Sequence, residues 1–180
     1  MAVLVALSAC GSSDETASTL APVHGTYSPD IDAANFVSAV DNPLWPLKPG
    51  SAYHYSGMRG TTPQTDDEVV LRQQRRILGI NATIVRDTVS ENGRPIERTL
   101  DYYAQDRQGN VWYLGEDSFE LRRGRFVKAS DSWLSGVNGA QPGIIMPAHP
   151  NPGDRYRLQH HVCGHFAKIQ RRTFLPSARD

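Results

Sequence analysis

The sequence predicts a mainly β protein, an antiparallel meander that forms a curved half-barrel or a sandwich, with a short N-terminal helix and a long proline- and glycine-rich loop. Three observations predict this class. From residue 51 onward, polar and apolar residues alternate with a period of two. Short stretches of turn-forming residues separate these runs, as in consecutive hairpins, and the strongest hairpin turn signal is Asn92-Gly93. Residues 101–120 gather acidic and aromatic side chains around one turn signal at 107–110, which predicts a central hairpin.

The first ten residues predict export and lipidation. They are apolar but too short to span a bilayer, which needs about 20 residues. Leu7-Ser8-Ala9-Cys10 resembles a bacterial lipobox, in which the cysteine thiol receives the lipid, so Cys10 is the predicted lipidation site. The absence of a lysine or arginine before the apolar run departs from the usual signal peptide. Residues 1–10 are thus interpreted as a signal segment and residues 11–30 as a flexible tether to the membrane.

The composition predicts one β-rich domain, residues 31–161. Nineteen basic and nineteen acidic residues leave no net charge, which gives no electrostatic reason to expect a nucleic-acid partner. The chain has two cysteines, and acylation of Cys10 would leave Cys163 without a disulfide partner. We expect a monomer without cofactors, whose fold depends on its apolar core.

The elements are predicted in order from the N-terminus. Apolar residues at 33, 36, 37 and 40 predict a short amphipathic helix over 31–40. Trp45, between two prolines, is interpreted as a plug over one end of the β domain or as a binding platform. The alternating runs predict strands at 51–57, 68–77, 82–90, 95–105, 110–115, 119–122, 125–129 and 155–160. Residues 133–154 are predicted to lack regular structure, with the apolar island 143–147 folding back over the core.

Three blocks of sequence resemble an uncharacterised family of bacterial exported proteins, many of them lipoproteins. The blocks are Asp41-Asn42-Pro43-x-x-Pro46-Leu47-x-Pro49-Gly50, Tyr103-Ala104-Gln105-Asp106-x-x-Gly109-Asn110-Val111-Trp112-Tyr113-x-Gly115-Glu116-Asp117 and Gly136-Val137-Asn138-Gly139-Ala140-x-Pro142-Gly143-Ile144-Ile145-Met146-Pro147-Ala148. The resemblance implies an envelope location and a β-rich domain, but no known activity. It ends near residue 159, so residues 162–180 are interpreted as an atypical basic tail.

The leading functional hypothesis is a non-catalytic, membrane-tethered exported lipoprotein that binds an apolar or envelope-derived ligand, such as a glycan, or a partner protein. The predicted ligand-binding residues are large apolar or aromatic side chains: Trp45, Tyr102, Trp112, Ile144, Ile145 and Met146. A third class, a purely structural envelope protein, would instead have a filled core and no pocket.

The competing hypothesis is a glycan-directed hydrolase that uses a pair of carboxylates. Its candidate acidic residues are Asp101, Asp106, Glu116 and Asp117. Asp106 starts a turn, however, where an aspartate commonly caps the backbone for structural reasons.

A metal site is not predicted. His160, His161, Cys163 and His165 are suitable zinc or copper ligands, but adjacent histidines on a strand point to opposite faces of a sheet. The acidic residues of the central hairpin do not follow the ligand order of a calcium loop.

Overall fold

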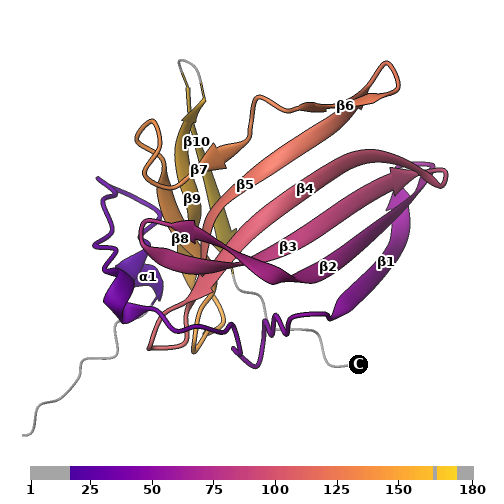
Figure 1. The fold of residues 1–180 in the computed structure, drawn as a ribbon. Helices are drawn as coiled ribbons and strands as arrows, with labels where there is room; N and C mark the ends of the chain where they lie inside the picture. The colour runs from indigo at the N-terminus through magenta and orange to yellow at the C-terminus, as the bar shows by residue number, and fades with distance from the viewer. Residues whose placement is uncertain (1–16, 164–165, 174–180) are drawn as a thin grey trace, which may run out of the picture.

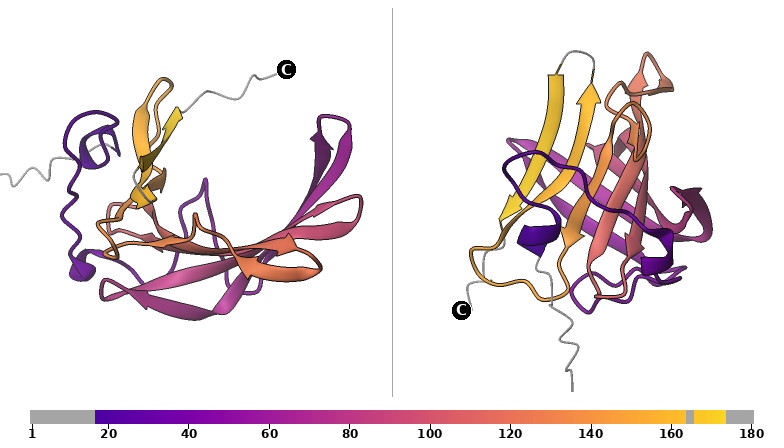
Figure 2. Two further views of the ribbon diagram at one scale, coloured as in Figure 1. Left: turned by 90° about the horizontal axis from the view of Figure 1, so that it is seen from above. Right: turned by 90° about the vertical axis from the view of Figure 1, so that its left-hand side faces the viewer.

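The computed structural model describes residues 17–163 and 166–173, which form one curled antiparallel sheet (Figure 1). The predicted mainly β class and the half-barrel form of it are confirmed. Neighbouring strands follow the order β1-β2-β3-β4-β5-β8-β9-β10, and β6 and β7 both pair with β5. Viewed from above, the strands follow an open U, with the β1–β2 end on one arm and β9–β10 on the other (Figure 2).

The helical elements are short and the strands long. The helices are α1 (Ala17–Leu20) and the 3-10 helix η1 (Ala33–Asn35). The strands are β1 (Ala52–Arg59), β2 (Thr62–Ile77), β3 (Ile80–Glu91), β4 (Arg94–Gln105), β5 (Val111–Arg122), β6 (Arg125–Lys128), β7 (Trp133–Leu134), β8 (Gln141–Met146), β9 (Arg155–Cys163) and β10 (Phe166–Thr173). Asn92 and Gly93 both have positive φ, as the predicted β3–β4 hairpin turn requires.

Strands β2 and β5 are much longer than predicted. β2 already begins at Thr62, before the predicted start at residue 68. Its polar first half pairs with the largely exposed strand β1 and therefore has no apolar pattern that would predict a strand. β5 joins two predicted strands into one. Gly115, with φ of 145°, lies at the register shift where β5 bulges against β4. The bulge interrupts the alternation in the sequence without ending the strand.

The proline- and glycine-rich segment contains regular structure, so the prediction for residues 133–154 is wrong. Its apolar island is the core of strand β8, which pairs with β5 and β9. Five consecutive residues of β8 are buried, so no polar residues alternate with the apolar ones to reveal the strand. At Gly143 a Cβ atom would lie 2.3 Å from the backbone carbonyl of Leu158, so only glycine allows this approach of β9.

The segment before β1 differs from the prediction at two places. The expected helix over 31–40 is reduced to η1, because Phe36 forms a β-bridge with Asp106 and therefore takes an extended backbone. The predicted tether contributes to the core: Ala21 and Tyr27 are buried, and the Tyr27 hydroxyl donates a hydrogen bond to the Pro142 carbonyl. The packed domain therefore begins before residue 31.

The sheet buries apolar side chains on both faces. We call them the Trp112 face, with Tyr102, Trp112, Ile144 and Tyr156, and the Trp45 face, with Val70, Val85, Val111 and Tyr113. The N-terminal segment covers the Trp112 face with Tyr27 and Phe36, while residues 40–47 cover the Trp45 face with Val40 and Leu47. The two covers are consecutive in sequence, so the chain crosses from one face to the other between residues 36 and 40.

The backbone of the predicted atypical tail is described in part. β9 extends beyond its predicted end, and β10 pairs with it in antiparallel register. The side chains of His160, His161 and Cys163, and all of His165, lie outside the described residues.

Close approach at Gly143 leads to a stability prediction. The substitution Gly143→Ala should lower the free energy of unfolding by about 1–3 kcal/mol, the usual cost of overpacking, as measured by urea denaturation. Gly57→Ala is the control, because no atom lies within 4 Å of the added Cβ. It should leave stability unchanged or slightly higher. Equal stability of the two variants would contradict the packing described here.

Candidate functional site

The six predicted ligand-binding residues do not line one pocket. Tyr102, Trp112 and Ile144 are buried in the core of the Trp112 face, whereas Ile145 and Met146 are buried with the Trp45 face. These five side chains are mainly core residues, although Trp112 also borders a hollow beside Phe36. Trp45 is the member of the set that lies at an open apolar groove.

The Trp45 groove is a hollow of about 290 Å³ at the end of the half-barrel. Leu44 and Tyr55 are each about half exposed, at 52% and 51%, and both line this hollow, so they form one apolar surface. The Trp45 ring packs edge-on against the Tyr103 ring, with 6.3 Å between ring centroids. The lining residues are Leu44, Trp45, Pro46, Leu47, Tyr53, Tyr55 and Glu68.

Buried hydrogen bonds fix the segment that carries Trp45. The Gln105 side-chain oxygen accepts from the backbone N–H groups of Asp41 and Asn42 at 2.9 and 2.8 Å. The Asn42 side-chain amide donates to the Gly109 and Pro147 carbonyls at 2.8 and 3.1 Å. The groove wall is therefore positioned before any ligand arrives, which reduces the entropy cost of binding.

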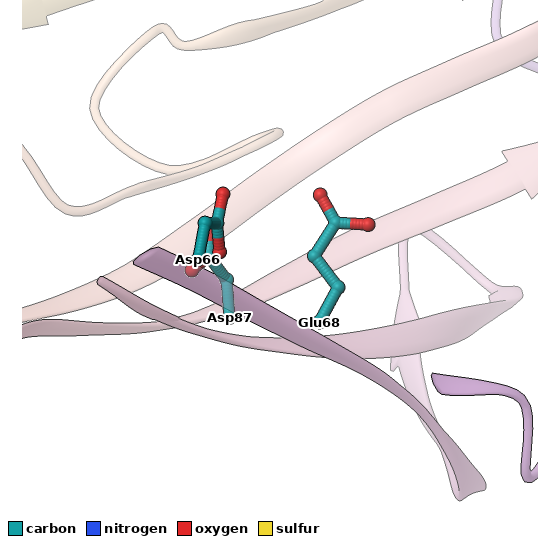
Figure 3. A group of neighbouring side chains, drawn as sticks. All are labelled: Asp66, Glu68 and Asp87. Atoms are coloured by element: carbon teal, nitrogen blue, oxygen red, sulfur yellow. The ribbon is translucent and has the colours of Figure 1, made fainter. Parts of the chain in front are cut away.

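Carboxylates from three strands form an acidic patch beside the groove, which we define as Asp66, Glu68, Asp87 and Asp101. Each carboxylate lies two positions along its strand from another member of the patch or from an apolar residue of the Trp45 face. Alternate residues of a strand point to the same side of the sheet, so the whole patch lies on the Trp45 face. Asp66 and Glu68 on β2 and Asp87 on β3 each bring one oxygen within 4.8 Å of the other two (Figure 3). Glu68 also lines the groove, so the apolar and acidic surfaces are continuous.

The carboxylates of the acidic patch are partly shielded from water and repel one another. Burial, contact with the Asp66 carboxyl and the charges of Asp66, Asp101 and Glu68 raise the pKa of Asp87 well above its usual range. Burial and the charges of Asp66 and Asp101 likewise raise the pKa of Glu68. Protons or another cation would therefore relieve repulsion in this patch. Three such oxygens are also the kind of ligand that calcium or magnesium takes.

Asp101 and Glu116 lie opposite each other on β4 and β5 and meet at one hydroxyl. The Tyr113 Oη lies 2.6 Å from the Asp101 carboxylate and 3.0 Å from that of Glu116. Burial raises the pKa of Tyr113 well above its usual range, so its hydroxyl stays protonated and donates its single hydrogen to one of the two. Burial also raises the pKa of Asp101 to about 6, although hydrogen bonds from Tyr113 and Thr99 oppose this.

The other two candidate catalytic residues have structural partners. Asp106 accepts hydrogen bonds from the Asn110 backbone N–H, the Asn110 side chain and the Trp112 indole, at 2.8–2.9 Å. Asp117 lies on the Trp112 face, where it accepts from Arg75, Lys128 and Tyr102. Burial would raise the pKa of Asp117, but these hydrogen bonds lower it to about 2.

Of the acidic patch, only Asp101 is among the carboxylates predicted from the sequence, because the predicted candidates all lie in the central hairpin. Asp66 and Asp87 are 21 positions apart and come together only through the pairing of β2 with β3. The one sequence signal was the spacing of Asp66 and Glu68, which puts both on one face if residues 57–66 are read as strand.

Comparisons of the chain with known protein families, with curated proteins and with solved structures find no match. Among the described residues, no helix is long and apolar enough to cross a membrane. Cys10 lies outside the described residues.

The role of Asp106 is testable through stability. Asp106→Ala should lower the free energy of unfolding by more than about 2 kcal/mol, because it leaves buried donors on Asn110 and Trp112 without an acceptor. Asp106→Asn, which keeps one side-chain oxygen, should lose less. Chemical denaturation measures both. Unchanged stability in Asp106→Ala would contradict a structural role.

The raised pKa of Asp101 predicts that stability falls as pH rises. The folded protein holds this proton up to about pH 6, whereas the unfolded chain releases it near pH 3.9. Between pH 4 and pH 7 the free energy of unfolding should therefore fall by up to about 3 kcal/mol because of this group. Urea denaturation at both pH values should show a smaller loss in Asp101→Asn, and an unchanged loss in the exposed control Asp30→Asn. The same loss in all three proteins would refute the assignment.

Proposed function

We propose that this protein is an exported lipoprotein, tethered at the cell envelope through Cys10, that binds an apolar or envelope-derived ligand or a partner protein without catalysing a reaction. The lipobox-like residues before Cys10 support the anchor, and the resemblance to exported bacterial proteins supports the location. The observation that carries the binding role is the Trp45 groove, an open apolar hollow whose wall is held by the Asn42 and Gln105 hydrogen bonds.

The arrangement of the carboxylates favours binding over hydrolysis. Of the four candidate catalytic residues, Asp106 completes a turn and Asp117 lies on the opposite face of the sheet. Only Asp101 and Glu116 are neighbours, and Asp101 is 8% exposed. A glycan would have to reach a buried aspartate.

The hydrolase alternative keeps one favourable observation. Oxygens of the Asp101 and Glu116 carboxylates lie 2.6 and 3.0 Å from the same Tyr113 hydroxyl, and such closeness suits the carboxylate pair of a retaining glycosidase. A pKa of about 6 suits Asp101 as the general acid of such a pair, with Glu116 as the second carboxylate.

Native mass spectrometry of the full chain purified from a bacterial envelope tests the binding role. We expect a co-purifying lipid or glycan mass whose occupancy falls roughly tenfold in Trp45→Ala, since the lost apolar contact is worth about 1.5 kcal/mol or more. Leu44→Ala, a truncation of a half-exposed side chain, should also lower occupancy without disturbing the core. The control is Val137→Ala, which removes an equally exposed apolar side chain outside the groove.

Two results would count against this proposal. One is a bound mass that all three variants retain equally, which would place the ligand elsewhere. The other is release of sugars from cell-wall glycan by the wild type that Asp101→Asn and Glu116→Gln both abolish, which would favour the hydrolase.

A further inference from the structure

Strand β1 is an edge of the sheet. It ends the strand order, and no strand of the described residues pairs with its outer side (Figure 1). Seven of its eight residues are exposed, including Tyr55 and Met58, which is 64% exposed. Natural sheets usually protect such an edge with proline, lysine, a bulge or a covering segment. β1 contains no proline or lysine, and its register with β2 has no bulge.

The backbone of β1 presents hydrogen-bonding groups to a further strand. The Val70 N–H donates to the Ser51 carbonyl, so the backbone carbonyl of residue 51 points toward β2. The backbone N–H and C=O groups of every second residue after it also point toward β2. The residues between them, His54, Ser56 and Met58, therefore turn their N–H and C=O groups outward. These groups are arranged to pair with an extended segment.

Two hollows lie beside this edge, and each is lined in part by residues of the Trp45 face. The first is the Trp45 groove, which includes Tyr53 and Tyr55. The second, of about 230 Å³, lies between Tyr55 and Met58 over Gly57, where no atom lies within 4 Å of a built Cβ. The hollows share Tyr55 and are thus offset by about two strand residues, roughly 6.6 Å, which is the distance between alternate side chains of an extended peptide.

Each hollow has a carboxylate on its inner wall. Glu68 lines the first and Asp66 the second, and both belong to the acidic patch. Arg59, at the end of β1, already pairs with Glu91. Among the described residues, no ion pair involves Asp66 or Glu68. A ligand at this edge therefore meets apolar walls beside negative charge, and charge complementarity favours a basic ligand.

We propose that β1 is the docking edge for an extended, basic segment of a partner protein, which adds to the sheet as a further strand. Its main chain pairs with the outward groups of residues 54, 56 and 58. Alternate side chains enter the two hollows, an aromatic or aliphatic one against Trp45 and Tyr55 and a lysine or arginine toward Asp66 and Glu68. Main-chain pairing supplies affinity and the hollows supply specificity, as in other cases of strand addition. This inference rests on the proposed binding role of the Trp45 face and is independent of the lipid anchor.

A fluorescent nine-residue peptide of sequence TKTWTKTWT is a suitable probe, because its lysines and tryptophans all lie on one face of an extended chain. We expect saturable binding to the full-length protein by fluorescence anisotropy, weakening as salt screens the charges. The peptide with glutamate in place of lysine should not bind. Equal affinity for both peptides would overturn the charge argument.

The variant Ser56→Pro isolates strand addition. It removes an outward N–H at an edge position that tolerates proline. We expect at least about tenfold weaker peptide binding, since a proline also blocks close pairing. Ser56→Ala keeps the N–H and should bind like the wild type. The double variant Asp66→Asn/Glu68→Gln should bind severalfold more weakly and with less dependence on salt. Equal affinity of Ser56→Pro and Ser56→Ala would overturn the proposal.

Other outcomes distinguish this inference from the proposed function. If an apolar ligand co-purifies and depends on Trp45 but the peptide does not bind, the docking edge is refuted and the proposed function stands. If the peptide binds through residue 56 but no apolar mass co-purifies, the partner is a protein and the groove is part of its docking site. A concentration-dependent dimer that Ser56→Pro abolishes would replace the partner by a second copy of this chain.

Discussion

The hydrogen bonds around the Asp106 turn hold the rest of the fold together. Within the hairpin, the Asp106 carboxylate binds the Asn110 backbone and the Trp112 indole. The same turn binds two other parts of the chain: Asn42 donates to the Gly109 carbonyl, and the Asn110 side chain accepts from the backbone of Ala148. One turn thus joins the central hairpin, the segment that covers both faces, and the end of β8. The side chains of Asn42, Asp106 and Asn110 are buried, so removing the partner of one of them leaves a buried polar group without a hydrogen bond.

Burying both faces of the sheet restricts where a ligand can bind. Tyr27, Phe36 and their neighbours cover most of the Trp112 face and leave a hollow beside Phe36 and Trp112, while Val40 and Leu47 cover the middle of the Trp45 face. Open apolar surface remains at the free end of the half-barrel, where Leu44, Trp45 and β1 meet. The same end carries the acidic patch, whose charges repel one another and gain from a proton or a basic group. Open apolar surface, free strand edge and negative charge therefore occur together.

Function is harder to predict from this sequence than fold, because the residues with the most conspicuous chemistry serve the structure. Asp106 and Trp112 stand out in the central hairpin, yet they bind each other across its turn. Ile144 stands out in an otherwise irregular segment, yet it is a fully buried core residue. By contrast, Asp66 and Asp87, whose carboxylates lie close together, have no motif around them. Their proximity depends on strand register, which turn length and packing determine together.

The sequence by itself determined the mainly β class, the central and Asn92-Gly93 hairpins, and the turn role of Asp106, since alternation and turn chemistry are local properties. Only the tertiary structure decided that β8 is a strand, that Ala21 and Tyr27 belong to the core, and which tryptophan reaches open surface. Those features depend on contacts between distant residues: a strand buried on both faces has no alternation, and Tyr27 is ordered by a carbonyl 115 positions away. The edge at β1 and its acidic neighbours follow from the strand order, which no local pattern encodes.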